Sequence, residues 1–469
     1  MGPDLYQTSS IALGIITMSE GRNSFRIITF GCKVNQYESA YIVESLARAG
    51  CREAPKDEKA DITIINTCIV TQRASYQSRQ AIRKAIRENP GGVVAAVGCY
   101  GQAFPEELSR INGIQLIAGN TSKGQLPEIL FPTSPRPSSP GGEGGVDDTP
   151  LIISKGFESH IPFECVPIKR FPNRTRAFLK IQDGCQSFCS YCIVPYARGP
   201  LRSLDPSKVV AMLRSFSETG YKEVVLTGIH LGKYGFDFNN GTDLKGLLRQ
   251  IGKQGLPLRI RLSSLEPNEI DRELIEMVAT EPWLCRHFHI PLQSGDNAIL
   301  KKMNRTYTAG EFKSLIELIH KRIPLAAIGV DVMAGFPGED DRAYQNTFVL
   351  IRGLPVSYLH VFPFSPREGT AAARFPGQVN EKVVKSRTAE LRHMGQKKKT
   401  VFHESCIGKG FLVLAEGWES EERKMVKGLS DNYLKVLFPS QELIKNELRL
   451  LVMEKGVGMG IIGRPQEQP

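Results

Sequence analysis

The sequence lacks any apolar run that approaches the about 20 residues of a membrane-spanning helix. Residues 11–18 are apolar, but the run is short and no basic segment precedes it, so we do not interpret it as a signal peptide. The ten cysteines lack the dense spacing of a small secreted disulfide scaffold. We therefore expect a protein with no membrane partner and no disulfide framework.

Acidic residues are too few to balance the basic ones, with 49 Asp and Glu against 60 Lys and Arg. The resulting net charge of +11 favours a polyanionic partner such as nucleic acid. The chain is otherwise ordinary for a globular protein, with 41% hydrophobic and 23% charged residues. Its 469 residues allow roughly three domains of about 150 residues each.

The chain is organised around one cysteine-rich stretch, KIQDGCQSFCSYCIVPYARGPLR, at residues 180–202. Cys185, Cys189 and Cys192 stand there at C-x3-C-x2-C spacing, directly after a strand-like run at residues 177–181. Three thiolates on a four-iron cluster leave one iron open to a small molecule. A structural zinc site is the alternative, but it usually has four ligands, and no further Cys or His lies in this stretch.

This spacing, with the aromatic Tyr191 before the last cysteine, resembles the radical S-adenosylmethionine (radical SAM) superfamily. The resemblance implies that the amino and carboxylate groups of SAM chelate the open iron. Cluster ligands need a reducing compartment, so we expect a cytoplasmic protein.

Residues 25–131 alternate strand-like and helix-like segments, which predicts a parallel α/β sheet. The expected strands lie at 25–30, 61–66, 93–98 and 114–117, and helices are expected at 35–50 and 71–89. The second of these helices carries several arginines.

A cysteine follows each of the first three strands: Cys32, Cys68 and Cys99. The carboxyl ends of parallel strands share one edge of a sheet, where ligands of such folds usually bind. The three thiols can therefore converge on a second three-thiolate cluster site. Buried core cysteines are the alternative, and the repeated position at strand ends favours the cluster.

Residues 154–389 alternate strands and helices again and predict an open, partial (β/α)6 TIM-like barrel. The six expected strands are 177–181, 223–227, 258–263, 287–292, 326–333 and 358–363. Active sites of such barrels gather at the carboxyl ends of the strands. Conspicuous motifs stand there, including TGIHLGKYG (227–235), SSLEP (263–267) and QSG (293–295).

The rest of the chain completes an α/β protein with a small carboxyl-terminal β-barrel. Residues 371–400 hold eight Lys or Arg and two Glu, which fits either a solvated helix face or a surface that faces RNA. Short strands punctuated by glycine follow and predict the β-barrel. The predicted segments are a disordered extension (1–24), the α/β domain (25–131), a Pro/Gly/Ser-rich linker (132–153), the partial barrel (154–400) and the β-barrel (401–469).

Nearly the whole chain, about residues 25–463, resembles the methylthiotransferase family. The resemblance rests on TFGCKVNQYES (29–39), NTC (66–68) and VGCYGQ (97–102), with the radical SAM triad and a β-barrel of the TRAM type. Four segments, GCKVNQYES, TGIHLGKYG, RLSSLEP and HVFPFSPREGT, resemble the branch that acts on N6-threonylcarbamoyladenosine in tRNA. That base, at position 37, lies on the 3′ side of the anticodon.

Two sister branches act on isopentenyladenosine in tRNA and on an aspartate of a ribosomal protein. They usually show GCQMN-like and GCPKN-like starts, and residues 33–35 (KVN) match neither. A non-catalytic iron–sulfur protein that senses and binds RNA is the remaining alternative, but it would not explain the motifs at successive barrel strand ends.

The resemblance also implies roles for single residues. Cys185, Cys189 and Cys192 would hold the catalytic radical SAM cluster, and Cys32, Cys68 and Cys99 an auxiliary 4Fe–4S cluster. By position, Tyr191, Thr227, Gly228, Glu266 and Gln293 would contact SAM, residues 329–335 would flank its adenine, and Arg367 would face the pocket. The other cysteines, Cys51, Cys165, Cys285 and Cys406, are interpreted as structural.

The implied reaction replaces the C2 hydrogen of adenine with a thiomethyl group. The family uses two SAM molecules for each turnover: one methylates a sulfur held by the auxiliary cluster, and the other yields a 5′-deoxyadenosyl radical. The cofactors carry this chemistry while the protein positions them. The implied partners are a tRNA anticodon loop, splayed open at the target adenine, and a low-potential electron donor such as flavodoxin or ferredoxin. We expect the amino-terminal sheet edge to lie over the open barrel end.

The charge of the carboxyl-terminal segment departs from the expectation of an RNA-binding barrel. The last 69 residues hold nine Lys or Arg and ten Asp or Glu, so the predicted TRAM-like barrel is nearly neutral. Because RNA phosphates favour basic surfaces, the expected grip on RNA comes from one basic face of that barrel, or from residues 371–400 and the helix around Arg79 to Arg87.

Overall fold

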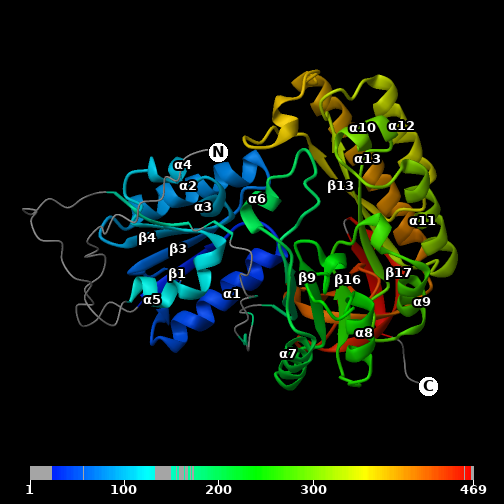
Figure 1. Cartoon of the computed structure of the whole chain (residues 1–469). Helices are drawn as coiled ribbons and strands as arrows, with labels where there is room; N and C mark the ends of the chain where they lie inside the picture. The colour runs from blue at the N-terminus through cyan, green and yellow to red at the C-terminus, as the bar shows by residue number, and fades with distance from the viewer. Residues whose placement is uncertain are drawn as a thin grey trace, which may run out of the picture. The chain divides into compact units, whose positions relative to one another are not determined.

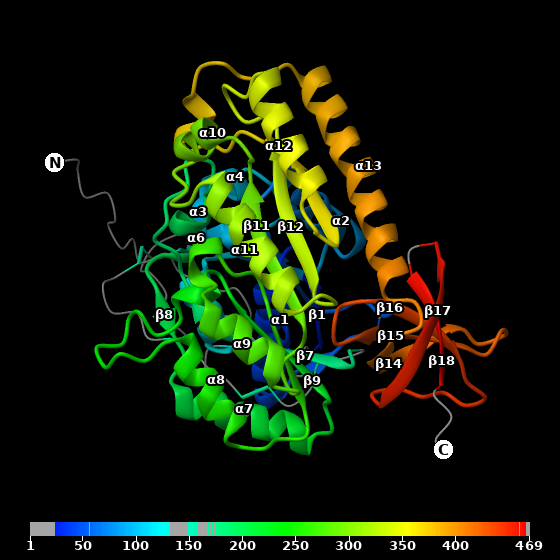
Figure 2. The same ribbon diagram turned by 90° about the vertical axis from the view of Figure 1, so that its right-hand side faces the viewer.

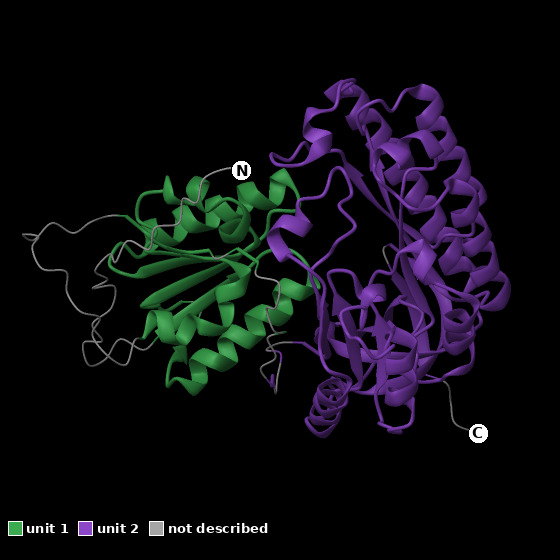
Figure 3. Ribbon diagram, in the orientation of Figure 1, with its two compact units in different colours: residues 1–166 green, residues 167–469 purple. Residues whose placement is uncertain are grey.

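The computed structural model describes residues 24–55, 57–131, 149–154, 156–157, 163, 167–168, 171, 174–458 and 460–465. The chain divides into two compact units, unit 1 at residues 1–166 and unit 2 at residues 167–469 (Figure 3). Residues 1–23 of the predicted extension and Cys165 lie outside the described residues. Across the described parts of the chain, no helix has the length and apolar character to cross a membrane.

Unit 1 is built on a six-stranded parallel sheet in the order β2-β1-β3-β4-β5-β6. Helices cover both of its faces (Figure 1). The strands are β1 (Ser24–Thr29), β2 (Arg52–Glu53), β3 (Ile62–Thr67), β4 (Val93–Gly98), β5 (Leu116–Ala118) and β6 (Leu151–Ile153). The helices are α1 (Lys33–Arg48), α2 (Gln72–Glu88), α3 (Cys99–Ala103), α4 (Pro105–Ser109), η1 (Asn120–Gln125) and α5 (Leu126–Leu130).

Continuous apolar runs explain the central strands of this sheet. Every residue of β3 is buried, and so are all residues of β4 except the first. Such runs are typical of parallel strands covered on both faces. The outermost strand corrects the sequence prediction, because Leu151–Ile153, assigned to the linker, pair in parallel with β5.

Unit 2 contains the six parallel strands of a partial barrel, in chain order. They are β7 (Arg176–Asp183), β9 (Glu223–Gly228), β10 (Arg259–Leu262), β11 (His287–Gln293), β12 (Ala327–Ala334) and β13 (Tyr358–Pro363). Between β10 and β11 the strand pairing is reduced to an isolated parallel bridge between Ile260 and Leu284. A further backbone hydrogen bond joins this region to β11, because Leu265 N donates to His289 O over 3.0 Å. A two-residue strand, β8 (Arg202–Ser203), runs antiparallel to β7.

Helices separate these strands and lie around their outside (Figure 2). They are α6 (Val194–Arg198), α7 (Pro206–Glu218), α8 (Leu244–Gly252), α9 (Arg272–Thr280), α10 (Asn297–Lys302), α11 (Ala309–Arg322) and α12 (Asp341–Gly353). Side-chain N-caps begin most of them, for example Asp271 for α9 and Thr308 for α11. In α8, residues Leu244, Leu247 and Ile251 form one buried face at helical spacing.

A 25-residue helix, α13 (Glu381–Ser405), leads into a closed five-stranded barrel. The helix runs past residue 400, where the sequence analysis placed the domain boundary. The strands are β14 (Gly410–Ser420), β15 (Met425–Ser430), β16 (Lys435–Pro439), β17 (Leu448–Val457) and β18 (Gly460–Pro465), in the order β14-β15-β16-β18-β17. The predicted α/β class, with its parallel amino-terminal sheet, partial barrel and small β-barrel, is confirmed.

Two buried arginines of β10 attach the carboxyl-terminal barrel to the partial barrel. Arg259 Nη2 donates to Leu429 O over 2.8 Å, and Arg261 Nη2 donates to Ser430 O over 2.9 Å. Glu223 of β9 accepts from the Nε atoms of both arginines at 2.7 Å. Arg261 belongs to the motif RLSSLEP, so part of that motif holds the two barrels of unit 2 together.

The cysteines outside the two triads are buried where the structure describes them. Cys51 lies in unit 1, and Cys285 and Cys406 lie in unit 2. Burial raises the pKa of the Cys285 thiol to about 12 and that of the Cys406 thiol to about 11. Such thiols stay protonated at neutral pH, as structural cysteines do.

Candidate functional site

The three cysteines of unit 1 stand at one edge of its sheet. Cys32 caps the start of α1 just after β1, Cys68 directly follows β3, and Cys99 follows β4 and begins α3. The three strands are neighbours, and Thr67 and Gly98, the residues before Cys68 and Cys99, are register partners. Neighbouring strands are about 4.8 Å apart, so the topology brings three positions from distant parts of the sequence together.

Gly31 lets the chain before Cys32 pass directly over Cys68. Its φ is +93°, and a Cβ at this position would lie 2.7 Å from Cys68 Sγ. Only glycine suits both the left-handed backbone and the close approach. Asn35 fastens the same loop to the sheet, because its Nδ2 donates to Thr67 O over 2.9 Å.

The end of β4 also has a glycine with a left-handed backbone and a close neighbour. Gly98 has a φ of +99°, and a Cβ there would lie 2.6 Å from Asn66 Oδ1. On the far side of Cys99, Asn120 Nδ2 lies 3.5 Å from its Sγ. An amide N–H so placed can donate to a thiolate, and hydrogen bonds to sulfur tune cluster potentials.

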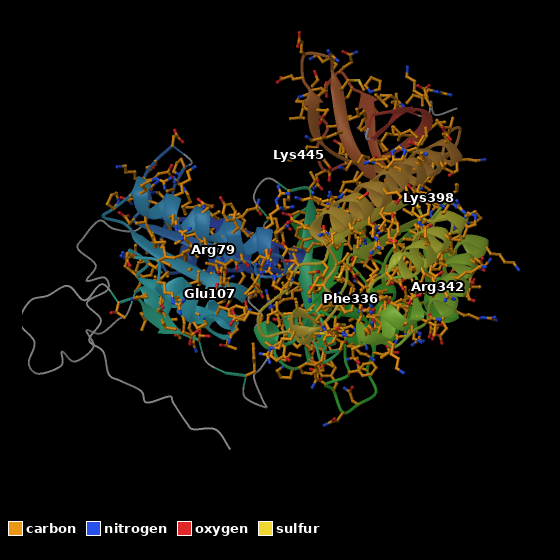
Figure 4. The ribbon with its side chains drawn as sticks, turned by 90° about the horizontal axis from the view of Figure 1, so that it is seen from above. Arg79, Glu107, Phe336, Arg342, Lys398 and Lys445 are labelled. Atoms are coloured by element: carbon orange, nitrogen blue, oxygen red, sulfur yellow. The ribbon has the colours of Figure 1, made fainter. Side chains whose placement is uncertain are left out.

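Tyr100, the residue after Cys99, ties the site to the basic helix α2. Its hydroxyl accepts from Arg79 Nη1 over 2.5 Å and donates to Glu107 Oε2 over 2.5 Å. Arg79 and Glu107 are labelled in Figure 4. Arg79, a candidate for RNA binding from its sequence, thus bonds to the side chain of the residue next to a predicted ligand.

The donor set at this sheet edge fits an iron–sulfur cluster. Cys68 and Cys99 are buried and Cys32 is exposed, so the edge is accessible at Cys32. Three thiols are the soft ligands that such clusters use. The glycine beside Cys68 leaves room for a sulfur that any larger residue would crowd.

In unit 2, the loop after β7 carries Cys185, Cys189 and Cys192. Its entry requires glycine, because Gly184 has a φ of +79° and a Cβ there would lie 1.8 Å from Pro200 O. Within the loop, Cys192 N donates to Cys189 O over 2.9 Å. The turn gathers the three thiols at the carboxyl end of the first barrel strand, where active sites of such barrels lie.

A histidine from the next loop reaches the first of these thiols. His230 Nδ1 lies 3.5 Å from Cys185 Sγ, and His230 Nε2 lies 2.6 Å from Glu269 Oε1. Burial alone would lower the pKa of His230, but the bonds to Cys185 and Glu269 raise it to about 10. The imidazole of His230 therefore lies where it can donate a hydrogen bond to the Cys185 sulfur.

An arginine reaches the second thiol. Arg305 Nη1 lies 3.3 Å from Cys189 Sγ, its Nη2 forms an ion pair with Glu266, and its Nε donates to Tyr307 Oη over 3.0 Å. Burial raises the pKa of the Glu266 carboxyl, and the guanidinium opposes that rise. Glu266 also caps the short helix η3 (Pro267–Glu269).

Tyr191 and Cys192 form the inner side of the loop. Burial raises the pKa of Cys192 to about 12. The Tyr191 ring meets Phe336 edge to face, with 6.4 Å between ring centroids, beside the buried side chains of Met303 and Ala372. Tyr191 thus anchors the loop on the barrel wall, and its contact with SAM stays a prediction.

The remaining predicted pocket residues lie at or near the ends of barrel strands. Thr227 and Gly228 end β9, and Gln293 ends β11 with a φ of +62° that turns the chain there. Residues 329–335 cover most of β12 and the glycine after it, and Arg367 is buried after β13. A Cβ on Gly228 would lie 2.9 Å from the Gln182 side chain. The assigned roles of these residues stay predictions.

Sequence reasoning missed the residues that surround the triad. His230 lies 45 positions and Arg305 116 positions from the cysteines they contact. His230 stands in TGIHLGKYG at a strand end, which was a usable signal. Arg305 follows α10 in a segment without a motif, so only the fold reveals it.

Two family models match the chain. The family UPF0004, described as uncharacterized, matches residues 24–119, which contain Cys32, Cys68 and Cys99. The radical SAM superfamily matches residues 179–351, which contain Cys185, Cys189 and Cys192.

Curated relatives match almost end to end. A threonylcarbamoyladenosine tRNA methylthiotransferase of Aquifex aeolicus (strain VF5) is 36% identical over 425 residues, covering 90% of this chain and 98% of the relative. One of Bacillus subtilis (strain 168) is 36% identical, covering 91% and 93%. A tRNA-2-methylthio-N(6)-dimethylallyladenosine synthase of Pelotomaculum thermopropionicum (strain DSM 13744 / JCM 10971 / SI) is 33% identical, covering 88% and 91%.

Among solved structures, the chain resembles the radical SAM methyltransferase TsrM of Kitasatospora setae, determined with cobalamin and a [4Fe–4S] cluster bound. The TM-score is 0.57 at 16% identity, covering 75% of this chain and 77% of that chain. At this identity the likeness concerns the fold alone.

Proposed function

The chain belongs to the methylthiotransferase family of radical SAM enzymes, which use SAM and 4Fe–4S clusters, and from this premise we propose that it modifies tRNA. The proposed reaction converts N6-threonylcarbamoyladenosine at position 37 to its 2-methylthio derivative. The observation that carries the proposal is the 36% identity, over about 90% of the chain, to relatives named for that activity.

The chain's own residues prepare two cofactor sites. A cluster on Cys185, Cys189 and Cys192 would supply the electron that cleaves SAM, and one on Cys32, Cys68 and Cys99 would supply sulfur. His230 and Arg305 place ring and guanidinium nitrogens 3.5 and 3.3 Å from two of the three triad sulfurs, Cys185 Sγ and Cys189 Sγ. Donors aimed at thiolate sulfur stabilise its negative charge and thereby favour the reduced cluster.

A second candidate substrate is N6-isopentenyladenosine of tRNA. Relatives named as synthases of the 2-methylthio-N(6)-dimethylallyladenosine product are 30–33% identical over most of the chain. The two substituents differ in chemistry, because the threonylcarbamoyl group carries a carboxylate and a hydroxyl, whereas the isopentenyl group is apolar. The higher identity to the first group favours the threonylcarbamoyl substrate.

The proposed chemistry also implies an electron donor and a reducing compartment. Reductive cleavage of SAM needs a low-potential electron donor, for which flavodoxin or ferredoxin is suited. Thiolate-bound clusters persist in a reducing compartment, so we place the reaction in the cytoplasm.

The test uses the purified chain with both clusters reconstituted, SAM and dithionite. Three substrates are compared: tRNA with threonylcarbamoyladenosine at position 37, tRNA with isopentenyladenosine, and the ribosomal protein with its target aspartate. Mass spectrometry should detect a thiomethyl group on the first alone. Modification of another substrate instead would refute the assignment, and absence of any SAM cleavage would favour the non-catalytic sensor.

Two cysteine variants complete the test: Cys189→Ala, which should lose activity, and Cys285→Ala, which is its matched control. The Cys189→Ala variant removes one predicted ligand of the radical SAM cluster and should abolish SAM cleavage. A Cys285→Ala variant removes a buried cysteine outside both triads and should leave turnover within about twofold.

A further inference from the structure

Unit 2 has a cavity of about 350 Å³ beside the last barrel strand. Its walls come from β13, from the second half of α13, and from the loop and first residue of β16 in the carboxyl-terminal barrel. Figure 2 shows α13 running along the partial barrel and ending at the carboxyl-terminal barrel. Pockets of about 300 Å³ or more suit small ligands or single nucleotides.

Three cationic side chains line this cavity. Arg392 and Lys399 come from α13, and Lys435 comes from β16. Among the described residues that line it, none is Asp or Glu. Burial lowers the pKa of Lys399, and the positive charge of Lys435 lowers it further. Both lysines line the cavity, so a bound anion would interact favourably with them.

Aromatic side chains form the floor. The rings of Tyr358 and Tyr433 are stacked with 5.7 Å between centroids. Tyr433 has a φ of +67°, a left-handed conformation that non-glycine residues rarely adopt. The Tyr433 ring also stacks on His287, with 4.3 Å between centroids, and Arg261 lies 5.2 Å from its centroid, so these rings form a packed wall beside the cations.

The cavity also reaches a polar cluster inside the partial barrel. His360 lines the cavity and lies 3.3 Å from Asp331, whose carboxylate also accepts from His289 at 2.9 Å. These three residues lie on β13, β12 and β11, the last three strands of the partial barrel. A ligand in the cavity would therefore touch both the basic helix α13 and the barrel strands.

We propose that this cavity binds an anionic group of the tRNA substrate through Arg392, Lys399 and Lys435. The proposal rests on the proposed function and adds the surface by which unit 2 holds RNA. The proposal also explains how a nearly neutral carboxyl-terminal barrel can take part in RNA binding. The barrel contributes one cation to the site, and α13 contributes the other two.

Neighbouring lysines of the same helix have other surroundings. Lys398 Nζ donates to Arg352 O over 2.7 Å and to Leu354 O over 2.5 Å, so it caps the end of α12 (Figure 4). Lys397 is exposed and lines a separate groove with Phe348 and Val401. Of the three consecutive lysines, only Lys399 lines the proposed site.

The cavity lies at the amino-terminal ends of β12 and β13, away from the carboxyl strand ends where the reaction is proposed, so the anionic group it would bind is a backbone phosphate of the anticodon stem-loop. The experiment measures the Kd of the cluster-loaded enzyme for two anticodon stem-loop RNAs by fluorescence anisotropy, over a series of salt concentrations. One RNA carries N6-threonylcarbamoyladenosine at position 37 and the other carries unmodified adenosine there.

Lys399→Ala should weaken binding about fivefold to tenfold and lower the slope of log Kd against log salt by about 0.7, as loss of one contact to a single strand predicts. Lys399→Arg keeps the charge and should bind within about twofold of the natural protein. Lys397→Ala removes the same charge two positions away and is the matched control, with a change below about twofold.

Equal weakening for both RNAs is the expected result for a phosphate contact, and weakening confined to the modified RNA would assign the cavity to the threonylcarbamoyl carboxylate and overturn the phosphate assignment. Natural affinity of Lys399→Ala for both RNAs, or an equal loss in Lys397→Ala, would overturn the proposal. Reductive SAM cleavage without RNA, measured on the same preparations, should be unchanged in all variants. The Kd is measured without turnover, so a failure of the proposed binding site can be distinguished from a failure of the proposed reaction.

Discussion

Single glycines decide how closely the chain can approach the predicted sulfur ligands. Gly31 and Gly184 both have left-handed backbones, and a Cβ on either would collide with a neighbour, Cys68 Sγ in one case and Pro200 O in the other. Any other residue at these positions must move a ligand or its supporting backbone. Ligand geometry in both units thus depends on residues that have no side chain.

Gly31→Ala should therefore lose the auxiliary cluster. The added Cβ would lie 2.7 Å from Cys68 Sγ, so the thiol must move. Iron content after reconstitution should fall from about eight to about four atoms per chain. Gly50→Ala is the control, because Gly50 has a similar φ of +86° with no atom within 4 Å of the added Cβ. Full iron content in Gly31→Ala would show that the loop adapts.

The Arg305–Glu266 pair offers a second test at this scale. The Arg305 side chain is 5% exposed, and Arg305→Met leaves the Glu266 carboxylate without its guanidinium. Removing one partner of a buried pair costs about 3 kcal/mol of unfolding free energy. Urea denaturation of the cluster-free protein should show this loss and its partial recovery in Arg305→Met/Glu266→Gln. Additive losses in the double variant would mean that the pair is not coupled.

Elements with a strong repeating pattern were predictable from sequence, and short edge elements were not. The prediction of 358–363 for the last barrel strand matches β13 (Tyr358–Pro363), because an apolar run with clear ends leaves little freedom. By contrast, β2 and β6 have two and three residues and exist because a neighbouring strand offers hydrogen bonds. In β15, Lys427 and Gly428 interrupt the apolar residues, so its sequence pattern indicates a strand only weakly.

The contact between the two barrels of unit 2 should be sensitive to acid. Burial alone would raise the pKa of Glu223, but Arg261 and Arg259 hold it at about 2. The folded pKa is below the ordinary value, so this stabilisation is fully present above about pH 4.5 and is lost as the pH falls towards 2. The shift corresponds to a stabilisation on the order of 3 kcal/mol.

Glu223→Gln should remove that part of the acid dependence, measured as unfolding free energy in urea between pH 5 and pH 3. Glu273→Gln is the matched control, because the Glu273 carboxylate is exposed and pairs with Lys245 and Arg249 at the surface. Its acid dependence should stay close to that of the natural protein, because solvent screens an exposed ion pair. Equal acid sensitivity in Glu223→Gln and the natural protein would refute the role of this carboxylate.

At the scale of the whole molecule, each compact unit carries one complete cysteine triad. Variants in the two triads should therefore affect reductive SAM cleavage and methylthiolation of tRNA differently. Cys68→Ala should keep reductive SAM cleavage, since the other triad is intact, and lose methylthiolation of tRNA. Cys189→Ala should lose both, measured as 5′-deoxyadenosine and as modified nucleoside. Full methylthiolation by Cys68→Ala would remove the auxiliary site from the reaction.

The long-range contacts of the site mark the limit of sequence reasoning. The six cysteines could be predicted as cluster ligands because strand ends and a C-x3-C-x2-C spacing are local signals, and that assignment stays a prediction. His230 and Arg305 approach Cys185 and Cys189 only after β9 and the segment beyond α10 have been placed in the barrel. The cavity at α13 likewise joins Lys399 and Lys435 from separate elements, so no local pattern predicts it.

The most direct test of the central claim is nucleoside mass spectrometry of tRNA from a bacterial host whose own gene for this reaction is deleted. Expression of this chain should produce 2-methylthio-N6-threonylcarbamoyladenosine and deplete the unthiolated form, and expression of Cys99→Ala should not. An unchanged pool of N6-threonylcarbamoyladenosine would contradict the account. Conversion of isopentenyladenosine instead would contradict the substrate while leaving the chemistry in place.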